Sequence, residues 1–434
     1  MKRDKGKGYA LIFVLLMVAL ILLSITAVSF ITFSDLNMAK TASINMKAYY
    51  IAEAGLAKKF MDLRGSLTSS INPPGQNFTL NTAGTDFGTY VVNVTPMAAG
   101  NFLKYQLDAT GTYKNVKRTV SLIVQQSAIS RFAYMSDQET YGGNPIWFLS
   151  RDTIHGPLYT NGQIHVSGNP TFDGPVSSVS SSIAYYNGPP PQDNPNFLQS
   201  LTLGAAPIAM PTASDMLTGT TGIQHYAGLS GGLSLTGNTT INFLSNGTMD
   251  VTNKDAGWNN AKNKPIPADG AIYVNNTGSH SGTVNISGTL KGNVSIGASG
   301  DIYIVNNIKY NTNPVTNPAS TDMLGIVAGN NVYVDQNAPS DLEIDADIVA
   351  LNTSFAVVGY DGAMKGTLTL LGGVTQENRG AVGTFNSSTN TKTSGYTKNY
   401  NYDTRLLTAA PMYFPAAKDA NGRLIYRKVS WFES

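Results

Sequence analysis

The chain has 434 residues and a net charge of +2, and only 13% of its residues are charged. The absence of cysteine excludes disulfides, thiolate nucleophiles and cysteine-bound metals, while 43 glycines and 20 prolines indicate short strands separated by turns. Up to Gln126 there are 13 Lys and Arg against 6 acids, and beyond it 16 against 21, so the larger part gives no general electrostatic case for nucleic-acid binding.

The first element is an apolar stretch from Tyr9 to Phe33 that follows four basic residues in positions 2–7. As a helix, about 25 residues with a rise of about 1.5 Å each cross a hydrocarbon core of about 30 Å. The positive-inside rule predicts a single-pass membrane protein with a cytoplasmic amino terminus and everything after Asp35 outside the cytoplasm. A secretory signal peptide fits less well, because no compact apolar region with a small-residue cleavage site is present.

No proline interrupts the helical pattern between Asp35 and Leu63, so one helix of roughly 80 Å is predicted for residues 9–65. Its outer half is expected to be amphipathic. The predicted apolar side consists of Leu36, Ala39, Ser43, Met46, Tyr50, Ala54, Leu56 and Phe60.

Ile71 to Gly75 contains two prolines that end the helix, and a small antiparallel sheet is predicted for residues 66–128. It comprises a strand from Phe87 and a hairpin that turns at Lys114 and Asn115. The predicted buried face consists of Tyr105, Leu107, Val120, Leu122 and Val124.

From residue 129 to 415 the sequence consists of short β-branched pairs separated by Gly, Asn and Asp. The pairs recur about every 8 to 12 residues, which favours a right-handed parallel β-solenoid, with a β-sandwich as the alternative. The clearest pairs are Ile272 and Val274, Val284 and Ile286, Val294 and Ile296, and Ile302 and Ile304. Residues 416–434 form a last strand, which either closes the solenoid or returns to the small sheet.

The best candidate binding segment runs from Thr391 to Arg405, where cations interleave with tyrosines that stack on bases or sugar rings. The candidate DNA- or glycan-binding residues are Lys392, Tyr396, Lys398, Tyr400, Tyr402 and Arg405.

No nucleotide loop or Ser-His-Asp arrangement is identifiable, and we expect no enzymatic activity, metal or cofactor. Asp341, Glu343, Asp345 and Asp347 alternate with apolar residues, which predicts a solvated outer face rather than a calcium site. A polysaccharide-acting solenoid enzyme remains an alternative, although no carboxylate pair stands out.

Two features at the front resemble a known family. Gly8 followed by Tyr9 looks like the site at which a prepilin peptidase cuts and then methylates the new amino terminus, and AYYIAEAGL from Ala48 to Leu56 resembles the signature of type IV pilin-like proteins of the PilX amino-terminal family. The region beyond resembles, more loosely, solenoid-bearing competence pilins. The resemblance implies an α+β pilin module that carries the large all-β domain. It also implies a leader at 1–8 and partners that include prepilin peptidase, other major and minor pilins and the inner-membrane assembly platform.

Within this resemblance, Phe13, Tyr50, Glu53 and Gly55 are the residues expected at helix contacts in the pilus. Major pilins carry a glutamate where this chain has Phe13, and its loss implies a minor pilin at a pilus or pseudopilus tip. Phe13 is equally explained as one more lipid-facing residue. Glu53 either contacts another subunit or pairs with Lys47 or Lys58. The resemblance implies a location at a pilus or cell surface after assembly, where the expected function is pilus assembly with DNA capture or adhesion. The alternatives are a membrane-anchored surface adhesin and the polysaccharide-acting solenoid enzyme.

Overall fold

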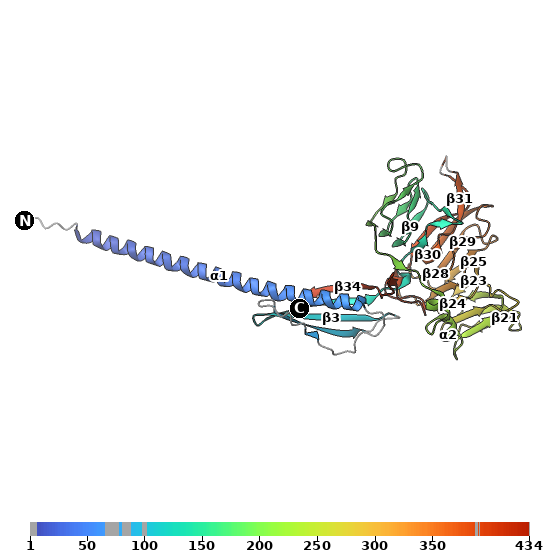
Figure 1. The fold of residues 1–434 in the computed structure, drawn as a ribbon, viewed down its shortest axis with the longest axis horizontal. Helices are drawn as coiled ribbons and strands as arrows, with labels where there is room; N and C mark the ends of the chain where they lie inside the picture. Colours follow the sequence, from blue (N-terminus) through green and yellow to red (C-terminus); the bar gives the residue numbers. More distant parts are fainter. Residues whose placement is uncertain are drawn as a thin grey trace, which may run out of the picture.

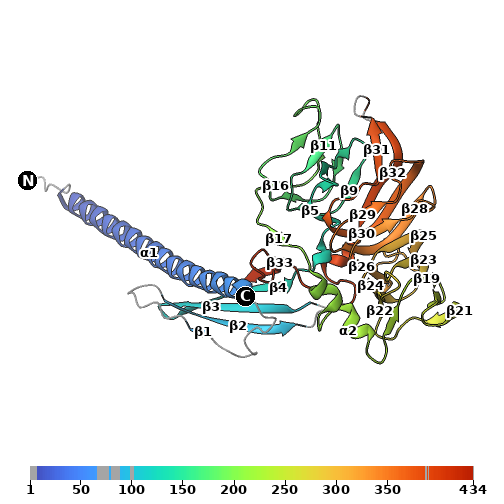
Figure 2. The ribbon, with the colours of Figure 1, turned by 45° about the vertical axis from the view of Figure 1, so that its right-hand side comes forward.

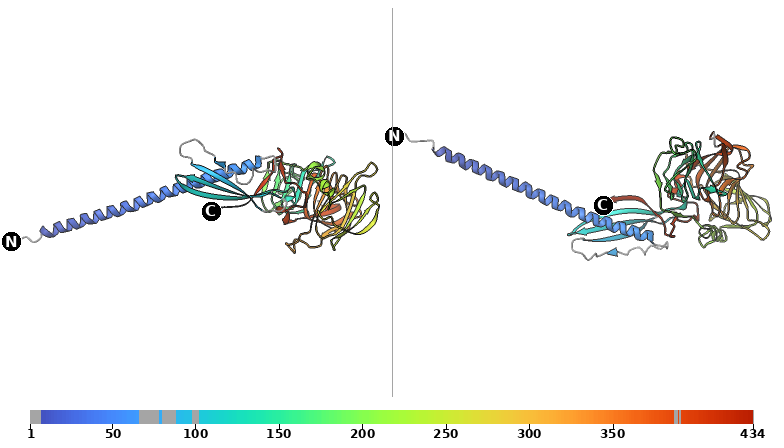
Figure 3. Two further views of the ribbon diagram at one scale, coloured as in Figure 1. Left: turned by 90° about the horizontal axis from the view of Figure 1, so that it is seen from below. Right: turned by 45° about the horizontal axis from the view of Figure 1, so that its top comes forward.

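The computed structural model describes residues 7–65, 78–79, 88–97, 102–386, 389 and 391–433. Three parts follow one another along the long axis: a long helix, a small sheet against the end of that helix, and a large β domain (Figure 1). The additional views show the same order (Figure 3). Residues 2–5 and the predicted helix end at 71–75 lie outside the described residues.

The helix α1 extends from Lys7 to Gly65, which confirms one uninterrupted helix. Its 59 residues correspond to a length of about 90 Å. Tyr9–Arg64 contains the one stretch in the described part of the chain that is long and apolar enough to cross a membrane, and none of that stretch is buried.

The small sheet is antiparallel and has five strands in the order β1-β2-β3-β4-β34. The strands are β1 (Phe78–Thr79), β2 (Thr89–Met97), β3 (Lys104–Tyr113), β4 (Val116–Gln126) and β34 (Tyr426–Glu433). The predicted turn is confirmed, since Lys114 and Asn115 both have positive φ. The predicted buried face is also confirmed, because each of its five side chains is at most 7% exposed.

The face of α1 that packs on this sheet differs from the predicted one. Leu56 was on the predicted side and is buried, but the other buried contacts include Ala48 and Ala52, whereas Met46 and Tyr50 on the predicted side are 55% and 58% exposed. The sheet approaches the helix along its smallest side chains, because these allow the closest contact.

The last strand, β34, pairs with β4, so the final residues return to the small sheet. Residues 127–425 therefore lie between two neighbouring strands of one sheet. The chain leaves the sheet through the 3-10 helix η1 (Ile129–Arg131). It returns through η3 (Thr404–Leu407) and a segment that crosses the β domain.

The β domain is built from three columns of parallel strands, whereas a β-sandwich is built from antiparallel ones. The first column contains β18 (Leu233–Thr236), β22 (Ala271–Asn275), β24 (Asn293–Ala298), β26 (Met323–Ala328), β28 (Leu342–Ala350), β30 (Met364–Asn378), β5 (Tyr134–Gln138), β10 (Leu158–Thr160), β13 (Val176–Ser178) and β16 (Leu201–Leu203). The second contains β19 (Thr239–Leu244), β23 (Val284–Leu290), β25 (Ile302–Tyr310), β27 (Val332–Val334) and β29 (Phe355–Val357). The third continues from β25, β28 and β30 into β32 (Thr391–Tyr402), β9 (Thr153–His155), β12 (Thr171–Phe172) and β15 (Asn196–Phe197).

The columns are assembled out of sequence order. The segment 233–402 stacks in chain order, and the earlier segment 134–203 then continues from its end, because β5 pairs with β30 and β9 pairs with β32. Figure 2 shows the green strands of the earlier segment beside the orange and red strands of the later one. The chain crosses between the two ends through a π-helical turn η2 (Ser214–Thr218) and α2 (Ile223–Ala227).

Shorter strands complete the domain at its edges. They are the parallel set β8 (Phe148–Leu149), β11 (His165–Ser167) and β14 (Ala184–Tyr185), and the antiparallel β6 (Thr140–Tyr141), β7 (Asn144–Pro145), β17 (Ile208–Ala209), β20 (Thr248–Asn253), β21 (Trp258–Pro265), β31 (Gly383–Asn386) and β33 (Lys418–Asp419). All eight side chains of the four predicted apolar pairs are fully buried in one continuous core, which confirms that part of the prediction.

Candidate functional site

The exposed apolar part of α1 is the first candidate functional surface. Between Tyr9 and Phe33 the large apolar side chains are 47–79% exposed, and Phe13 is 67% exposed. Such a surface is far larger than an isolated soluble protein leaves open, and its length and composition fit a membrane anchor. Gly8 lies within α1, one residue before the start of this surface.

Two glycines set the distance between α1 and the sheet. A Cβ atom on Gly55 would lie 2.6 Å from the ring of Tyr90, and a Cβ atom on Gly111 would lie 2.2 Å from the carbonyl oxygen of Ala48. Both positions are therefore closed to any larger side chain unless the helix moves. Gly55 was predicted at a contact between subunits, and the structure places it at this contact within the subunit.

Tyr50 and Glu53 lie on neighbouring parts of the same helix. Tyr50 is exposed and free to meet another molecule. The carboxylate of Glu53 accepts a hydrogen bond of 2.9 Å from the hydroxyl of Tyr49, rather than pairing with Lys47 or Lys58 as one interpretation expected. Its half-buried position next to the sheet explains this local partner.

The tyrosines of the predicted binding segment lie in β32, one strand of the third column. Tyr396 and Tyr400 are only 3% and 2% exposed, and their rings belong to the core. The Tyr396 hydroxyl donates to the carbonyl oxygen of Pro339 at 2.6 Å. Burial raises the pKa of Tyr396 to about 12. Tyr402 packs against the same core and donates to Ser130.

The cations of this segment are held by protein partners. Lys398 is buried and lies 2.7 Å from the carboxylate of Asp152. Lys392 donates to backbone carbonyl oxygens, and Arg405 forms an ion pair of 2.6 Å with Asp403. Three of the six side chains are buried and the other three are half-buried, and all six contact other groups of the domain, which does not fit the predicted surface for stacking.

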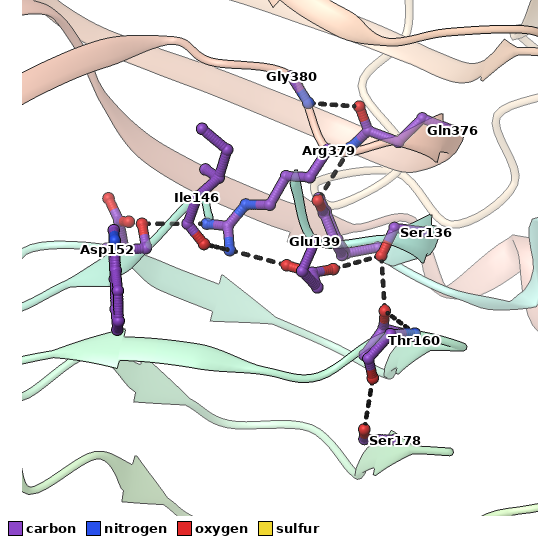
Figure 4. A network of polar contacts seen from close by, with 12 residues as sticks. Ser136, Glu139, Ile146, Asp152, Thr160, Ser178, Gln376, Arg379 and Gly380 are labelled. Atoms are coloured by element: carbon purple, nitrogen blue, oxygen red, sulfur yellow. Dashed lines mark hydrogen bonds and ion pairs between the residues drawn. The ribbon is translucent and has the colours of Figure 1, made fainter. Parts of the chain in front are cut away.

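A polar network lies where the two segments of the β domain meet (Figure 4). The guanidinium of Arg379, at the end of β30, donates to Glu139 at 2.9 Å and to the carbonyl oxygen of Ile146 at 3.1 Å. Ser136 donates to Glu139 and, at 2.9 Å, contacts the hydroxyl of Thr160. Arg379 and Glu139 are each 1% exposed, so this buried ion pair links residues that are 240 positions apart in the chain.

The acidic strand predicted as a solvated face is half buried, which corrects that prediction. Asp345 and Asp347 in β28 are each 2% exposed. Asp345 accepts from the backbone N–H of Tyr310 at 2.8 Å through one oxygen, and both oxygens of Asp347 lack a hydrogen-bond partner. Burial raises the pKa of Asp345 to about 7 and that of Asp347 well above its usual range. The described residues contain no cluster of three or more potential metal ligands.

A groove of about 900 Å³ lies beside Arg405, between a corner of the earlier segment and the loop around Val315. Two carboxylates line it. Asp173 contacts the ring of His155, and Asp403 contacts Arg405. Each acid is already held by a basic partner, so the groove does not present the pair of free carboxylic groups that the alternative hydrolase interpretation needs.

The chain has limited similarity to known proteins. The family model "Domain of unknown function (DUF4900)" matches residues 100–181, a range that includes the strands from β3 to β13. No curated protein sequence matches the chain. Among solved structures, the chain is similar to the crystal structure of the competence-associated pilin ComZ from Thermus thermophilus, with 13% identity and a TM-score of 0.39, over 90% of this chain and 98% of that chain.

Proposed function

We propose that this protein is a minor type IV pilin-like subunit that displays a β-solenoid at the tip of a pilus or pseudopilus. Its role is assembly and binding outside the cytoplasm rather than catalysis. The observation that carries the proposal is the division of α1 into two parts. Residues up to Phe33 form an exposed apolar rod, whereas residues from Ala48 onward are packed on an antiparallel sheet.

The exposed rod fits a lipid bilayer before assembly and the helices of other pilins after it. Cleavage after Gly8 by a prepilin peptidase would make Tyr9 the amino terminus, so that the apolar part starts directly at the end of the mature chain. Phe13 and Tyr50 are then surface residues available to neighbouring helices in the filament.

The shape of the subunit supports the proposed position at the tip. The parallel columns lie beyond the sheet on the side away from the amino terminus, in line with the long axis (Figure 1). A subunit within the shaft has other subunits beyond its head, and this domain would occupy their place. We infer that the columns form a β-solenoid inserted between β4 and β34, since each strand pairs in parallel with strands before and after it in a column.

The test is mass spectrometry of the amino terminus of the protein isolated from its native membranes. We expect a chain that begins at Tyr9 and carries one methyl group. Gly8→Val is expected to abolish cleavage and to keep the protein out of sheared filaments, whereas the matched variant Gly6→Val is cleaved normally.

A chain that begins at Met1, or one that is cut beyond Phe33, would refute the pilin-like role. An intact chain that stays in the membrane and still mediates attachment would identify the alternative, a membrane-anchored adhesin.

A further inference from the structure

A strip of tyrosines lies on the outer face of the second column. Tyr303 in β25 and Tyr333 in β27 are paired in register, and their ring centroids are 5.3 Å apart. Their neighbours Ile304 and Val334 point inward and are fully buried. Because side chains alternate along a strand, both tyrosines project outward, where their rings are half-buried.

Two more tyrosines from other parts of the chain extend the strip. Tyr141 in β6 contacts Tyr360 edge-on, with ring centroids 5.9 Å apart. The Tyr141 hydroxyl also lies near Tyr333 and adds to the effect of burial in raising the pKa of Tyr333. We define Tyr141, Tyr303, Tyr333 and Tyr360 as the tyrosine strip.

A second aromatic group follows the β6–β7 hairpin. The ring of Trp147 lies 5.0 Å from that of Tyr186, which in turn lies 5.8 Å from Phe385. Tyr186 is 42% exposed, and Trp147 and Phe385 are half-buried. Exposed and half-buried aromatic side chains thus come both from strand β6 and from the residues that follow β7 in the chain.

The core accounts for only part of the tyrosine strip. Tyr360 packs against the main core, but Tyr303 and Tyr333 lie on the opposite face of their strands from the fully buried Ile304 and Val334. Half-exposed tyrosines present a flat apolar face together with a hydroxyl that donates and accepts hydrogen bonds. This combination suits sugar rings, which have apolar C–H faces and many hydroxyls.

The charged residues beside the tyrosine strip indicate which class of polymer can bind there. Asp301 and Asp335 are the charged groups whose fields reach Tyr303, and they add to burial in raising its pKa. Negative charge at this place repels phosphate groups and the carboxylates of acidic glycans, whereas a nucleic-acid site requires Lys and Arg.

We propose that the tyrosine strip binds an uncharged polysaccharide, whose successive sugars stack on rings from neighbouring strands. This inference goes beyond the proposed function and does not depend on assembly into a filament. It places glycan binding on a surface other than the segment predicted from Thr391 to Arg405.

The test is isothermal titration of the full-length protein in a detergent without a sugar head group. The probes are soluble neutral glucans, mannans and galactans, with alginate and an oligo-dT as charged competitors. We expect saturable binding of at least one neutral polymer that changes little with salt. The double variant Tyr303→Ser/Tyr333→Ser should weaken it by about tenfold, as expected for the loss of two stacking contacts. Tyr303→Phe/Tyr333→Phe keeps the rings and should lose less.

The control is Leu198→Ser/Val315→Ser, which removes two side chains that are 60% and 71% exposed elsewhere on the domain. It should bind as the unmodified protein does. If the double serine variant is unfolded by circular dichroism, Tyr360→Ser at the end of the strip takes its place. The proposal is overturned if no neutral polymer binds, if a folded serine variant retains full affinity, or if the oligo-dT or alginate binds more tightly than every neutral polymer.

Discussion

Replacing Asp345 by asparagine tests whether a buried carboxyl group makes stability depend on pH. Asp345 is 2% exposed, and the charged groups that reach it are Glu343, Lys309 and Asp403. The first and the last of these are acids, so they add to burial in favouring the protonated form. Asparagine keeps an oxygen that accepts from the backbone N–H of Tyr310 but cannot ionise.

The direction in which stability changes with pH follows from the pKa values of Asp345 in the folded and unfolded states. Asp345 has a pKa of about 7 in the folded protein, against 3.8 for the ordinary side chain, so between these values the folded state binds more protons than the unfolded state. Stability contributed by the protonated group is therefore complete below pH 4, falls as the pH rises and is lost above pH 7. A difference of about 3 between the pKa values corresponds to at most about 4 kcal/mol.

We expect Asp345→Asn to remove this decrease in the free energy of unfolding with rising pH. Urea unfolding of the full-length protein, followed by circular dichroism from pH 4 to 8.5, should give similar free energies for both proteins at the acidic end. The variant should be more stable by up to about 4 kcal/mol at the basic end. Asp361→Asn, which changes an exposed carboxylate, is the matched control and should leave the profile unchanged. Profiles for Asp345→Asn that run parallel at all pH values would refute the reasoning, because Asp345 would then not titrate in this range.

Two further predictions concern packing. Gly111→Ala places a Cβ atom 2.2 Å from the backbone of α1 and should cost about 1–3 kcal/mol of unfolding free energy, whereas Gly278→Ala, with no atom within 4 Å, should cost little in the same urea titration. Arg379→Met leaves the buried carboxylate of Glu139 unpaired and should cost about 3–5 kcal/mol. The double variant Arg379→Met/Glu139→Leu should recover part of that loss, and a double variant no more stable than Arg379→Met would contradict this account.

The sequence was sufficient for elements with a local signal. The apolar run of α1, the Lys114–Asn115 turn and the period-two pairs around Ile272 each follow from neighbouring residues, and the structure has them as predicted. The returning strand β34 was one of two alternatives, because nothing in its residues selects β4 as its partner.

The errors have physical causes. Ala48 and Ala52 have a weak apolar signal, so the sequence pattern does not place them on the packing face of α1 that they share with Leu56. The interleaved tyrosines and cations of β32 predict a binding surface. Tyr396 and Tyr400 are four residues apart, however, so they lie on the same face of the strand, and that face is buried. The tyrosine strip cannot be predicted from the sequence pattern, because Tyr141 and Tyr360 are far apart in the chain and come into contact only when the strands stack.

The pairing of β5 with β30 determines when this domain can be completed during synthesis. Tyr134 in β5 pairs with Val374 in β30, which the ribosome adds 240 residues later. Until then β5 has an open edge, because the strand that pairs with it has not been synthesised. Contacts over such distances form slowly, and open edges are sites of aggregation. The small sheet can be completed only later, because its strand β34 ends at Glu433. A chain truncated anywhere before its last strand thus has an unfinished sheet beside α1, and only a fully synthesised molecule presents a finished head to its neighbours.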